Sequence, residues 1–147
     1  MRTPVTIAAF MACLFSASSV SASPIESSCL FLKVLGGNDA SSVTAMVDEI
    51  ASAWPEGNRS EASAALTNVL KELEFAGGSI WQIAKLGEDL EEHLVILRLS
   101  KGEVSSARLL YQWSPDGLAL AGLDFQRQYP QIISKQFLQT PQPVECP

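Results

Sequence analysis

The stretch ARLLYQWSPDGLALAGLDFQRQ, residues 107–128, decides the fold, because it reads as two strands joined by a tight turn. Pro115-Asp116-Gly117 suits a three-residue hairpin loop, since proline presets the first position and glycine adopts the left-handed one. This loop pairs Ser114 with Leu118, and the pairs farther out follow one by one. The hairpin has two faces, and the function depends on what each face touches.

The residues before this hairpin continue the two-residue alternation that is typical of strands. With the hairpin they give four strands, over residues 79–86, 92–100, 104–114 and 118–128. The connections are short, so the sheet should be an antiparallel meander. A second three-residue loop, Ser100-Lys101-Gly102, pairs Leu97 with Ser105 and Val95 with Ala107.

Both loops place one set of side chains on the same face of the sheet. These are His93, Val95, Leu97, Leu99, Ala107, Leu109, Tyr111, Trp113, Ala119, Ala121, Leu123 and Phe125. This inner face should receive the helices, because a sheet of this class packs one face against another layer. In this reading no acidic residue accompanies Tyr111 on the inner face.

The outer face mixes polar and apolar side chains. Arg108 lies opposite Asp124, which favours a cross-strand ion pair. The apolar members are Leu94, Ile96, Leu110, Leu118 and Leu120. An apolar patch of this kind on a soluble protein is usually covered or used. We expect a homodimer that packs through Arg108, Asp124 and these five apolar residues. The alternative is that the tail covers this face within one chain, with Ile132, Ile133 and Phe137.

Three helices precede the sheet, and their apolar residues recur at the spacing of one buried face. The first runs from Glu26 to Leu35, the second from Asp39 or Ser41 to Trp54, and the third from Asn58 or Ser60 to Gly77-Gly78. The expected fold class is α+β, with three N-terminal helices packed on a curved four-stranded antiparallel sheet. The domain should cover residues 23–128 and be followed by a Pro-rich, irregular tail over residues 129–147.

The first 22 residues have the pattern of a signal peptide. Arg2 precedes an apolar run from Val5 to Phe15, which is shorter than the roughly 20 residues that span a bilayer. Val20-Ser21-Ala22 fits the small-residue rule for cleavage before Ser23. We therefore expect a periplasmic or secreted protein with no membrane segment after cleavage.

Charge and cysteine content limit the partners. The sequence has 16 acidic residues against 10 Lys and Arg, which argues against binding to nucleic acid or to anionic membranes. Cys29 and Cys146 bracket the mature domain, so one disulfide is expected, with two free thiols or a metal site as the alternatives. A single histidine makes the metal site the weakest of these. We expect no cofactor, because no motif for one is present.

Three segments, FLKVLGGND (31–39), GGSIWQIAKL (77–86) and LLYQWSPDGLALAGLDFQ (109–126), resemble the NTF2-like (cystatin-like α+β) superfamily. The resemblance implies a curved sheet wrapped on a long helix, forming a cone with a pocket at its mouth, as in small exported domains of unknown function. Its members include isomerases, dehydratases and many binding or dimerising non-enzymes. The isomerase branch places a Tyr and an acid in the pocket, but Asp124 faces away from Tyr111 here.

The candidate pocket residues are Trp81, His93, Tyr111 and Trp113. His93 is a weak candidate general base, and the preferred reading is a rim histidine bonded to Glu91 or Tyr111. The acidic stretch GEDLEEH, residues 87–93, is expected to be a solvated loop rather than a cation site. We predict a non-enzymatic exported binding or interaction module that uses the cone pocket, for a small apolar ligand, or the outer sheet face. The alternative is an isomerase- or dehydratase-like enzyme that works with His93 and Tyr111.

Overall fold

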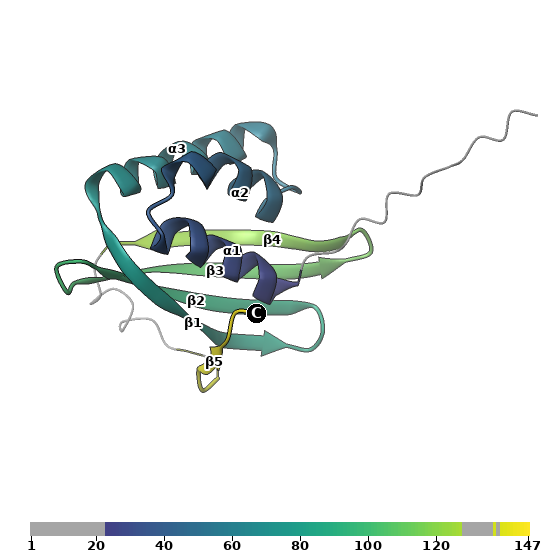
Figure 1. Ribbon diagram of the computed structural model, residues 1–147. Coiled ribbons are helices and arrows are strands. Elements are labelled where there is room, and N and C mark those ends of the chain that lie inside the picture. Colours follow the sequence, from purple (N-terminus) through teal and green to yellow (C-terminus); the bar gives the residue numbers. More distant parts are fainter. Residues whose placement is uncertain (1–22, 128–136, 138) are drawn as a thin grey trace, which may run out of the picture.

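The computed structural model describes residues 23–127, 137 and 139–147. Its helices are α1 (Pro24–Gly36), the short 3-10 helix η1 (Ala40–Ser42), α2 (Val43–Ile50) and α3 (Glu56–Glu72). Its strands are β1 (Phe75–Leu86), β2 (Leu90–Leu99), β3 (Val104–Ser114), β4 (Gly117–Gln126) and β5 (Gln142–Val144). The helices lie on one face of a single antiparallel sheet (Figure 1), so the predicted α+β class is confirmed.

The sheet has five strands in the order β4-β3-β2-β1-β5, one more than predicted. The additional strand comes from the tail, where Val144 pairs with Ile80 of β1. A strand edge presents unpaired backbone groups, and the tail covers part of that edge. Phe137 is 37% exposed, and Ile132 and Ile133, which were expected to hold the tail, lie outside the described residues.

Helix α1 begins two residues earlier than predicted because of its capping box. The Ser23 side chain accepts a hydrogen bond from the backbone N–H of Glu26, and the Glu26 carboxylate accepts one from the Ser23 N–H. Pro24 occupies the first turn, where its missing N–H costs nothing. The buried residues of this helix follow one face: Pro24, Ser27, Ser28, Phe31, Val34 and Leu35.

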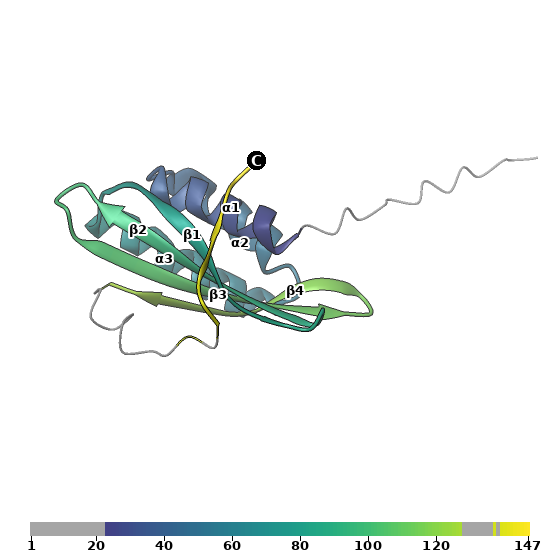
Figure 2. The same cartoon turned by 90° about the horizontal axis from the view of Figure 1, so that it is seen from below.

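The predicted register between β2 and β3 is confirmed. Leu97 pairs with Ser105 and Val95 with Ala107, and the Leu99 N–H donates to the Glu103 carbonyl across the turn. Val95, Leu97 and Ala107 are fully buried under the helices. The face that was predicted to receive the helices therefore does so in this part of the sheet (Figure 2).

The predicted register between β3 and β4 is wrong near the turn. Ser114 pairs with Gly117, not with Leu118, so the loop has two residues, and Gly117 takes a φ of 115°. A bulge between Leu110 and Tyr111 leaves Ala121 as an extra residue on β4, and farther out the predicted pairs return. The prediction placed three residues in the loop, whereas the structure has two in the loop and one, Ala121, in the bulge. The predicted and observed registers therefore differ only between the turn and the bulge.

This shift moves two expected outer-face residues to the inner face. Leu120 pairs with Tyr111 and is 2% exposed, and Leu118 pairs with Trp113 and packs against the core. The indole N–H of Trp54 donates to the Leu120 carbonyl, which ties the end of the α2 segment to the free edge of β4. The expected outer apolar patch is smaller by these two residues.

The predicted disulfide between Cys29 and Cys146 is present, with their Cα atoms 5.6 Å apart. It joins α1 to the segment after β5, at the edge of the sheet opposite β4. Among the described residues, no helix has the length and apolar character needed to cross a bilayer.

Candidate functional site

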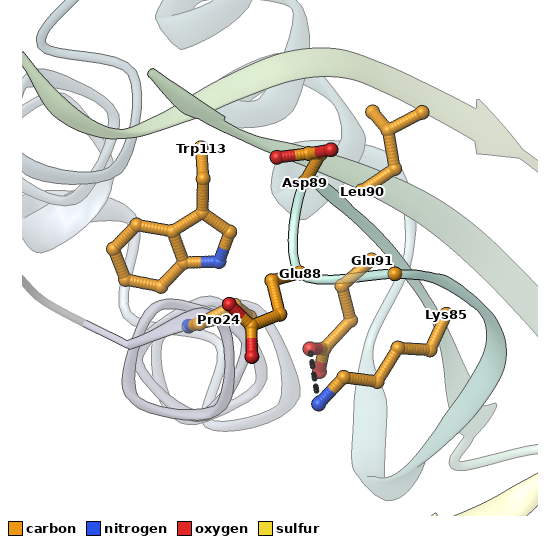
Figure 3. A pocket seen from close by; sticks show the side chains of 8 residues that line it. Pro24, Lys85, Glu88, Asp89, Leu90, Glu91 and Trp113 are labelled. Carbon is orange, nitrogen blue, oxygen red and sulfur yellow. Dashed lines mark ion pairs between the residues drawn. The ribbon is translucent and has the colours of Figure 1, made fainter. Parts of the chain in front are cut away.

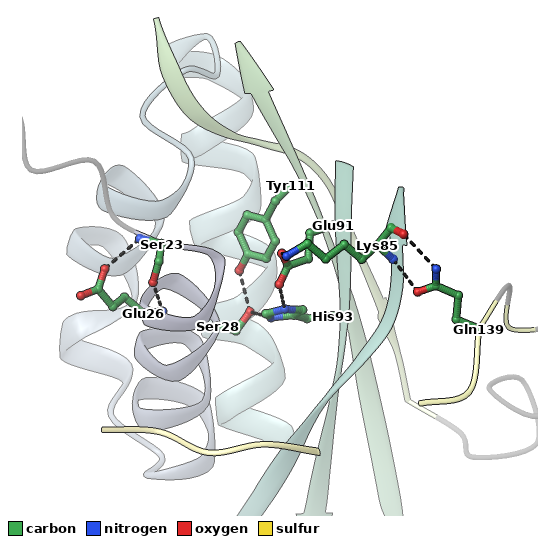
Figure 4. Close-up of polar contacts among 8 residues, drawn as sticks. All are labelled: Ser23, Glu26, Ser28, Lys85, Glu91, His93, Tyr111 and Gln139. Carbon is green, nitrogen blue, oxygen red and sulfur yellow. Dashed lines mark hydrogen bonds and ion pairs between the residues drawn. The ribbon is translucent and has the colours of Figure 1, made fainter. Parts of the chain in front are cut away.

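A continuous chain of buried polar side chains runs between α1 and the sheet (Figure 4). The Ser28 hydroxyl lies 2.7 Å from the Tyr111 hydroxyl and 2.8 Å from Nδ1 of His93. The other ring nitrogen of His93, Nε2, lies 2.7 Å from a carboxylate oxygen of Glu91. Three elements supply this chain: α1 supplies Ser28, β2 supplies Glu91 and His93, and β3 supplies Tyr111.

The direction of each hydrogen bond follows from the donors and acceptors that are available. An ionised Glu91 can only accept, so the proton of neutral His93 sits on Nε2. Nδ1 is then an acceptor and takes the Ser28 hydroxyl proton. The Ser28 oxygen in turn accepts from the Tyr111 hydroxyl. Every member has a partner in this arrangement, which is what a buried polar chain requires.

Burial sets the protonation of the two titratable groups inside the chain. His93 is 0% exposed and Tyr111 is 1% exposed. Burial lowers the pKa of His93 below its ordinary value, although the hydrogen bond and the charge of Glu91 act in the opposite direction. Burial likewise raises the pKa of Tyr111. At neutral pH the chain therefore holds a neutral imidazole and a protonated phenol.

The structure brings together two of the four predicted pocket residues, His93 and Tyr111, whose rings meet edge to face with centroids 5.5 Å apart. The bond from His93 to Glu91 was one of the two predicted alternatives and is confirmed, whereas the predicted rim position is wrong, because His93 is 0% exposed. The expectation that no acid lies beside Tyr111 is wrong, because Glu91 pairs with Tyr111 across the β2–β3 ladder. Strand alternation from His93 could have placed Glu91 there, and Ser28 could have been found as a polar residue on the buried face of α1.

Beyond Glu91 the chain reaches a pocket of about 540 Å³ at one end of the fold (Figure 3). We call it the end pocket. It is lined by Pro24 at the start of α1, by Lys85 and residues 87–91 around the β1–β2 turn, and by Trp113. The Lys85 ammonium lies 3.9 Å from the second carboxylate oxygen of Glu91. Glu91 thus links the surface of the end pocket to the buried chain.

Trp81 does not belong to this pocket. It pairs with Leu94 on the outer side of the sheet and packs against a small cluster formed by Ile83 and Leu94. Its neighbour Ile80 faces the core and is 2% exposed, so alternation turns Trp81 outward. The grouping of Trp81 with His93 is therefore wrong.

The outer face carries a bidentate ion pair that was not predicted. Arg108 donates to both carboxylate oxygens of Glu92, at 2.7 and 2.9 Å. Asp124 lies opposite Arg108 in the ladder, as predicted, and accepts a hydrogen bond from the Gln126 amide at 2.7 Å. A hollow of about 300 Å³ lies beside these residues, where Gly122 has no side chain to cover Leu110.

The outer apolar cluster is already largely shielded in a single chain. Leu94 is 4% exposed and Ile83 is 1% exposed, and Ile96 and Leu110 are half-buried.

Within the described ranges, no group of three or more His, Cys, Asp or Glu residues is placed to hold a metal ion. No model of a known protein family, no curated protein and no solved structure matches this chain.

Proposed function

We propose that the chain is an exported, non-enzymatic binding module of NTF2-like type, and that its end pocket takes a positively charged group carried on an apolar body. One observation carries this proposal. Trp113 is 38% exposed, one of the four most exposed large apolar side chains among the described residues, and it lines the end pocket together with Glu88, Asp89 and Glu91. An exposed aromatic side chain in a hollow favours a contact surface.

The charges of the lining favour a cation. Glu88, Asp89 and Glu91 supply three carboxylates, and the Lys85 ammonium already faces Glu91. Cleavage before Ser23 would add the Ser23 amino group next to Pro24, where the Glu26 carboxylate accepts a hydrogen bond from its nitrogen. The ring face of Trp113 attracts cations through its quadrupole, which is worth roughly 0.5–1 kcal/mol at exposed sites. The start of α1 carries a partial positive charge, which disfavours a cation, but the carboxylate of Glu26 in the first turn offsets this charge.

The cone interior is a weaker candidate for a ligand than the end pocket. The inner face under the helices is filled by side chains such as Phe31, Val95 and Leu109, each 0% exposed. This filling argues against the small apolar ligand that was expected inside the cone. The end pocket, which Trp113 and the β1–β2 turn line, is the hollow that we propose for the ligand.

An enzyme is the second candidate, because Ser28, His93 and Glu91 are connected in the order of a nucleophile, a base and an orienting acid. Ser28 and His93 are both 0% exposed. A substrate would need to displace α1 to reach either of them. The same contacts give each of Ser28, His93 and Tyr111 a hydrogen-bond partner inside a packed core, so they favour a structural role over catalysis.

Nuclear magnetic resonance tests the proposed ligand class, because each tryptophan gives its own indole N–H signal. Benzylammonium should shift the Trp113 signal in a saturable way and leave the Trp81 signal unchanged. Benzoate, which has the same ring and the opposite charge, is the matched control and should bind much more weakly. Exchanging Glu88→Gln and Asp89→Asn together should weaken benzylammonium binding by roughly threefold or more, as expected for partly screened charges.

Equal shifts from benzylammonium and benzoate would refute a cation site, and no shift from either would refute the end pocket as the binding surface. A small amine and a basic side chain of a partner protein share the same chemistry. A lysine-containing peptide that binds about tenfold more tightly than benzylammonium, a difference of about 1.4 kcal/mol, would assign the site to a protein partner. Equal binding would assign it to a small ligand.

A further inference from the structure

The described residues after 138 form a strap along the edge of the sheet, which we call the C-terminal strap, residues 139–146. It is attached at three places. The side-chain amide of Gln139 accepts from the backbone N–H of Lys85 and donates to its carbonyl, each at 2.9 Å. Strand β5 pairs with β1, and Cys146 is bonded to Cys29 of α1 (Figure 1).

The pairing of the C-terminal strap with β1 is short. It covers only Ile80, Trp81 and Gln82, which face Val144, Pro143 and Gln142. Proline has no N–H, so it fits an edge strand with its nitrogen turned away from the neighbour. The ladder bonds therefore fall on the Ile80–Val144 and Gln82–Gln142 pairs. Two such pairs hold a strand weakly without a further link.

The rest of the fold is built without the C-terminal strap. The fully buried core residues come from the helices and from β1 to β4, and Val144 is the one strap residue that packs against them, only partly buried. Strands β1 to β4 are joined by long ladders, each with nine paired positions, against three between β1 and β5. Removing the strap would cost edge contacts and leave the packing between helices and sheet in place.

The disulfide is the strap's covalent link, and its two residues differ in exposure. Cys146 is exposed, while Cys29 is half-buried on α1. A thiolate attacks the sulfur that it can reach, which favours attack at the more exposed residue, Cys146. Cys29 adjoins Ser28, and Lys85 lines the end pocket, so the strap touches elements that form both walls of that pocket.

We propose that the Cys29–Cys146 bond is a site of thiol–disulfide exchange with a dithiol oxidoreductase, and that its reduction releases the C-terminal strap while the domain stays folded. This inference is independent of the proposed function. A thiolate of the dithiol attacks Sγ of Cys146, the Sγ–Sγ bond breaks, and Cys29 leaves as a thiolate that takes a proton. The second thiol of the dithiol then displaces Cys146. Two electrons and two protons pass from the dithiol to the two cysteines.

Release has a defined structural consequence. The backbone groups of Ile80 and Gln82 lose their partners and become an open strand edge, which is a template for pairing with another strand. The backbone of Lys85 loses the Gln139 amide at the same time. Reduction thereby changes one edge of the sheet and one wall of the end pocket.

Hydrogen exchange of the purified protein, with and without dithiothreitol under native conditions, tests the proposal. In the chain that begins at Ser23, which lacks Cys13, alkylation should confirm two thiols after reduction and none before. Exchange at Ile80, Gln82 and Val144 should then accelerate roughly tenfold or more, while Val95 and Leu109 change by less than about twofold, as local opening requires. The Gln139→Ala variant is the matched control, because it loses a strap contact and keeps the disulfide, and its β5 should stay protected.

Three outcomes would overturn the inference. Loss of protection at Val95 and Leu109 on reduction would make the bond a staple of the whole fold. Unchanged protection of Val144 after both cysteines are alkylated would show that non-covalent contacts hold the strap. Resistance of the bond to dithiothreitol in the folded protein would show that it is not an exchange site.

Discussion

Ser28 and His93 lie 65 positions apart in the sequence, and the 2.8 Å bond between the Ser28 hydroxyl and Nδ1 of the His93 ring joins α1 to β2 inside the core. This bond makes the serine a junction, because its hydroxyl also meets Tyr111 on the next strand. The helix is thus positioned on the sheet by directional contacts as well as by apolar packing. Glu91 carries the same chain of bonds outward to the end pocket.

Replacing Ser28 by Ala should destabilise the fold markedly. The change leaves His93 Nδ1 and the Tyr111 hydroxyl buried without their partner, and each unsatisfied group costs about 1–3 kcal/mol. We expect a loss of about 2–4 kcal/mol in the free energy of unfolding, measured by urea denaturation. Ser27→Ala is the matched control, since Ser27 is buried on the same helix and lies outside this chain of bonds. Equal effects of the two changes would mean that the Ser28 bonds contribute no stability.

The free energy of unfolding should also decrease as the pH is lowered, because of His93. Its pKa in the folded state is lowered by burial, so the unfolded chain takes up the proton first as the pH falls through about 6.5. The contribution of neutral His93 is present above that pH and is lost below it. Between pH 7.5 and 5.5, wild type should lose up to about 1.4 kcal/mol more than His93→Gln, because over these two pH units the unfolded state binds on average about half a proton more than the folded state.

Urea denaturation of both proteins at the two pH values measures this difference. Titration of the carboxylates that do not contact His93 affects wild type and His93→Gln alike and therefore cancels in the comparison. His93 is the single histidine of the chain, so its ring signals can also be followed directly by nuclear magnetic resonance. The interpretation fails if the His93 ring protonates near pH 6.5 or above in the folded protein, because burial would then not dominate.

The sequence was sufficient for the layers of the fold but not for every register. Short turns and alternation determine β2 and β3, since each residue there has one partner and one face. They do not determine β4 near its turn, because the extra residue Ala121 leaves no trace in an alternating run of leucine and alanine. β5 could not be predicted either, since three residues that contain a proline have almost no strand pattern. It pairs with the edge that β1 offers, and the disulfide of Cys146 follows it directly.

The candidate site was accessible to sequence reasoning only in part. His93 and Tyr111 were found because the β2–β3 register put them on the inner face. Ser28 was missed because a serine on a helix gives no signal until its partner across 65 residues is known. Trp81 was misplaced because its size suggested a pocket, whereas its position next to Ile80 determines the opposite face.

The corrected register can be tested by comparing Leu120→Ala with Leu110→Ala. Leu120 is 2% exposed under the helices, whereas Leu110 is half-buried on the outer face. Deleting a buried leucine side chain costs about 2–5 kcal/mol, so Leu120→Ala should fall in that range. Leu110→Ala should cost roughly 1 kcal/mol or less, closer to a surface substitution. The opposite order, measured by urea denaturation, would restore the register in which Leu120 faces outward.

The oligomeric state is the remaining prediction that the register affects. The expected homodimer through the outer face rested on five apolar residues, of which Leu118 and Leu120 lie on the inner face and Leu94 is already buried in one chain. Trp81, Ile96 and Leu110 are each partly buried there. Burying any one of them in a dimer would therefore stabilise it by less than the roughly 1.5–3 kcal/mol that a fully exposed side chain gives on burial. Association itself costs about 4–15 kcal/mol.

We therefore expect the protein to be a monomer in light scattering at micromolar concentration, and Leu110→Glu to leave its molar mass unchanged. The ion pair of Arg108 with Glu92 is satisfied within one chain, so it adds no drive to association. A dimeric wild type that Leu110→Glu converts into a folded monomer would establish the outer face as an interface. A dimer that survives Leu110→Glu would place the contact elsewhere, and Trp113→Ala would then test the end pocket, where Trp113 is exposed.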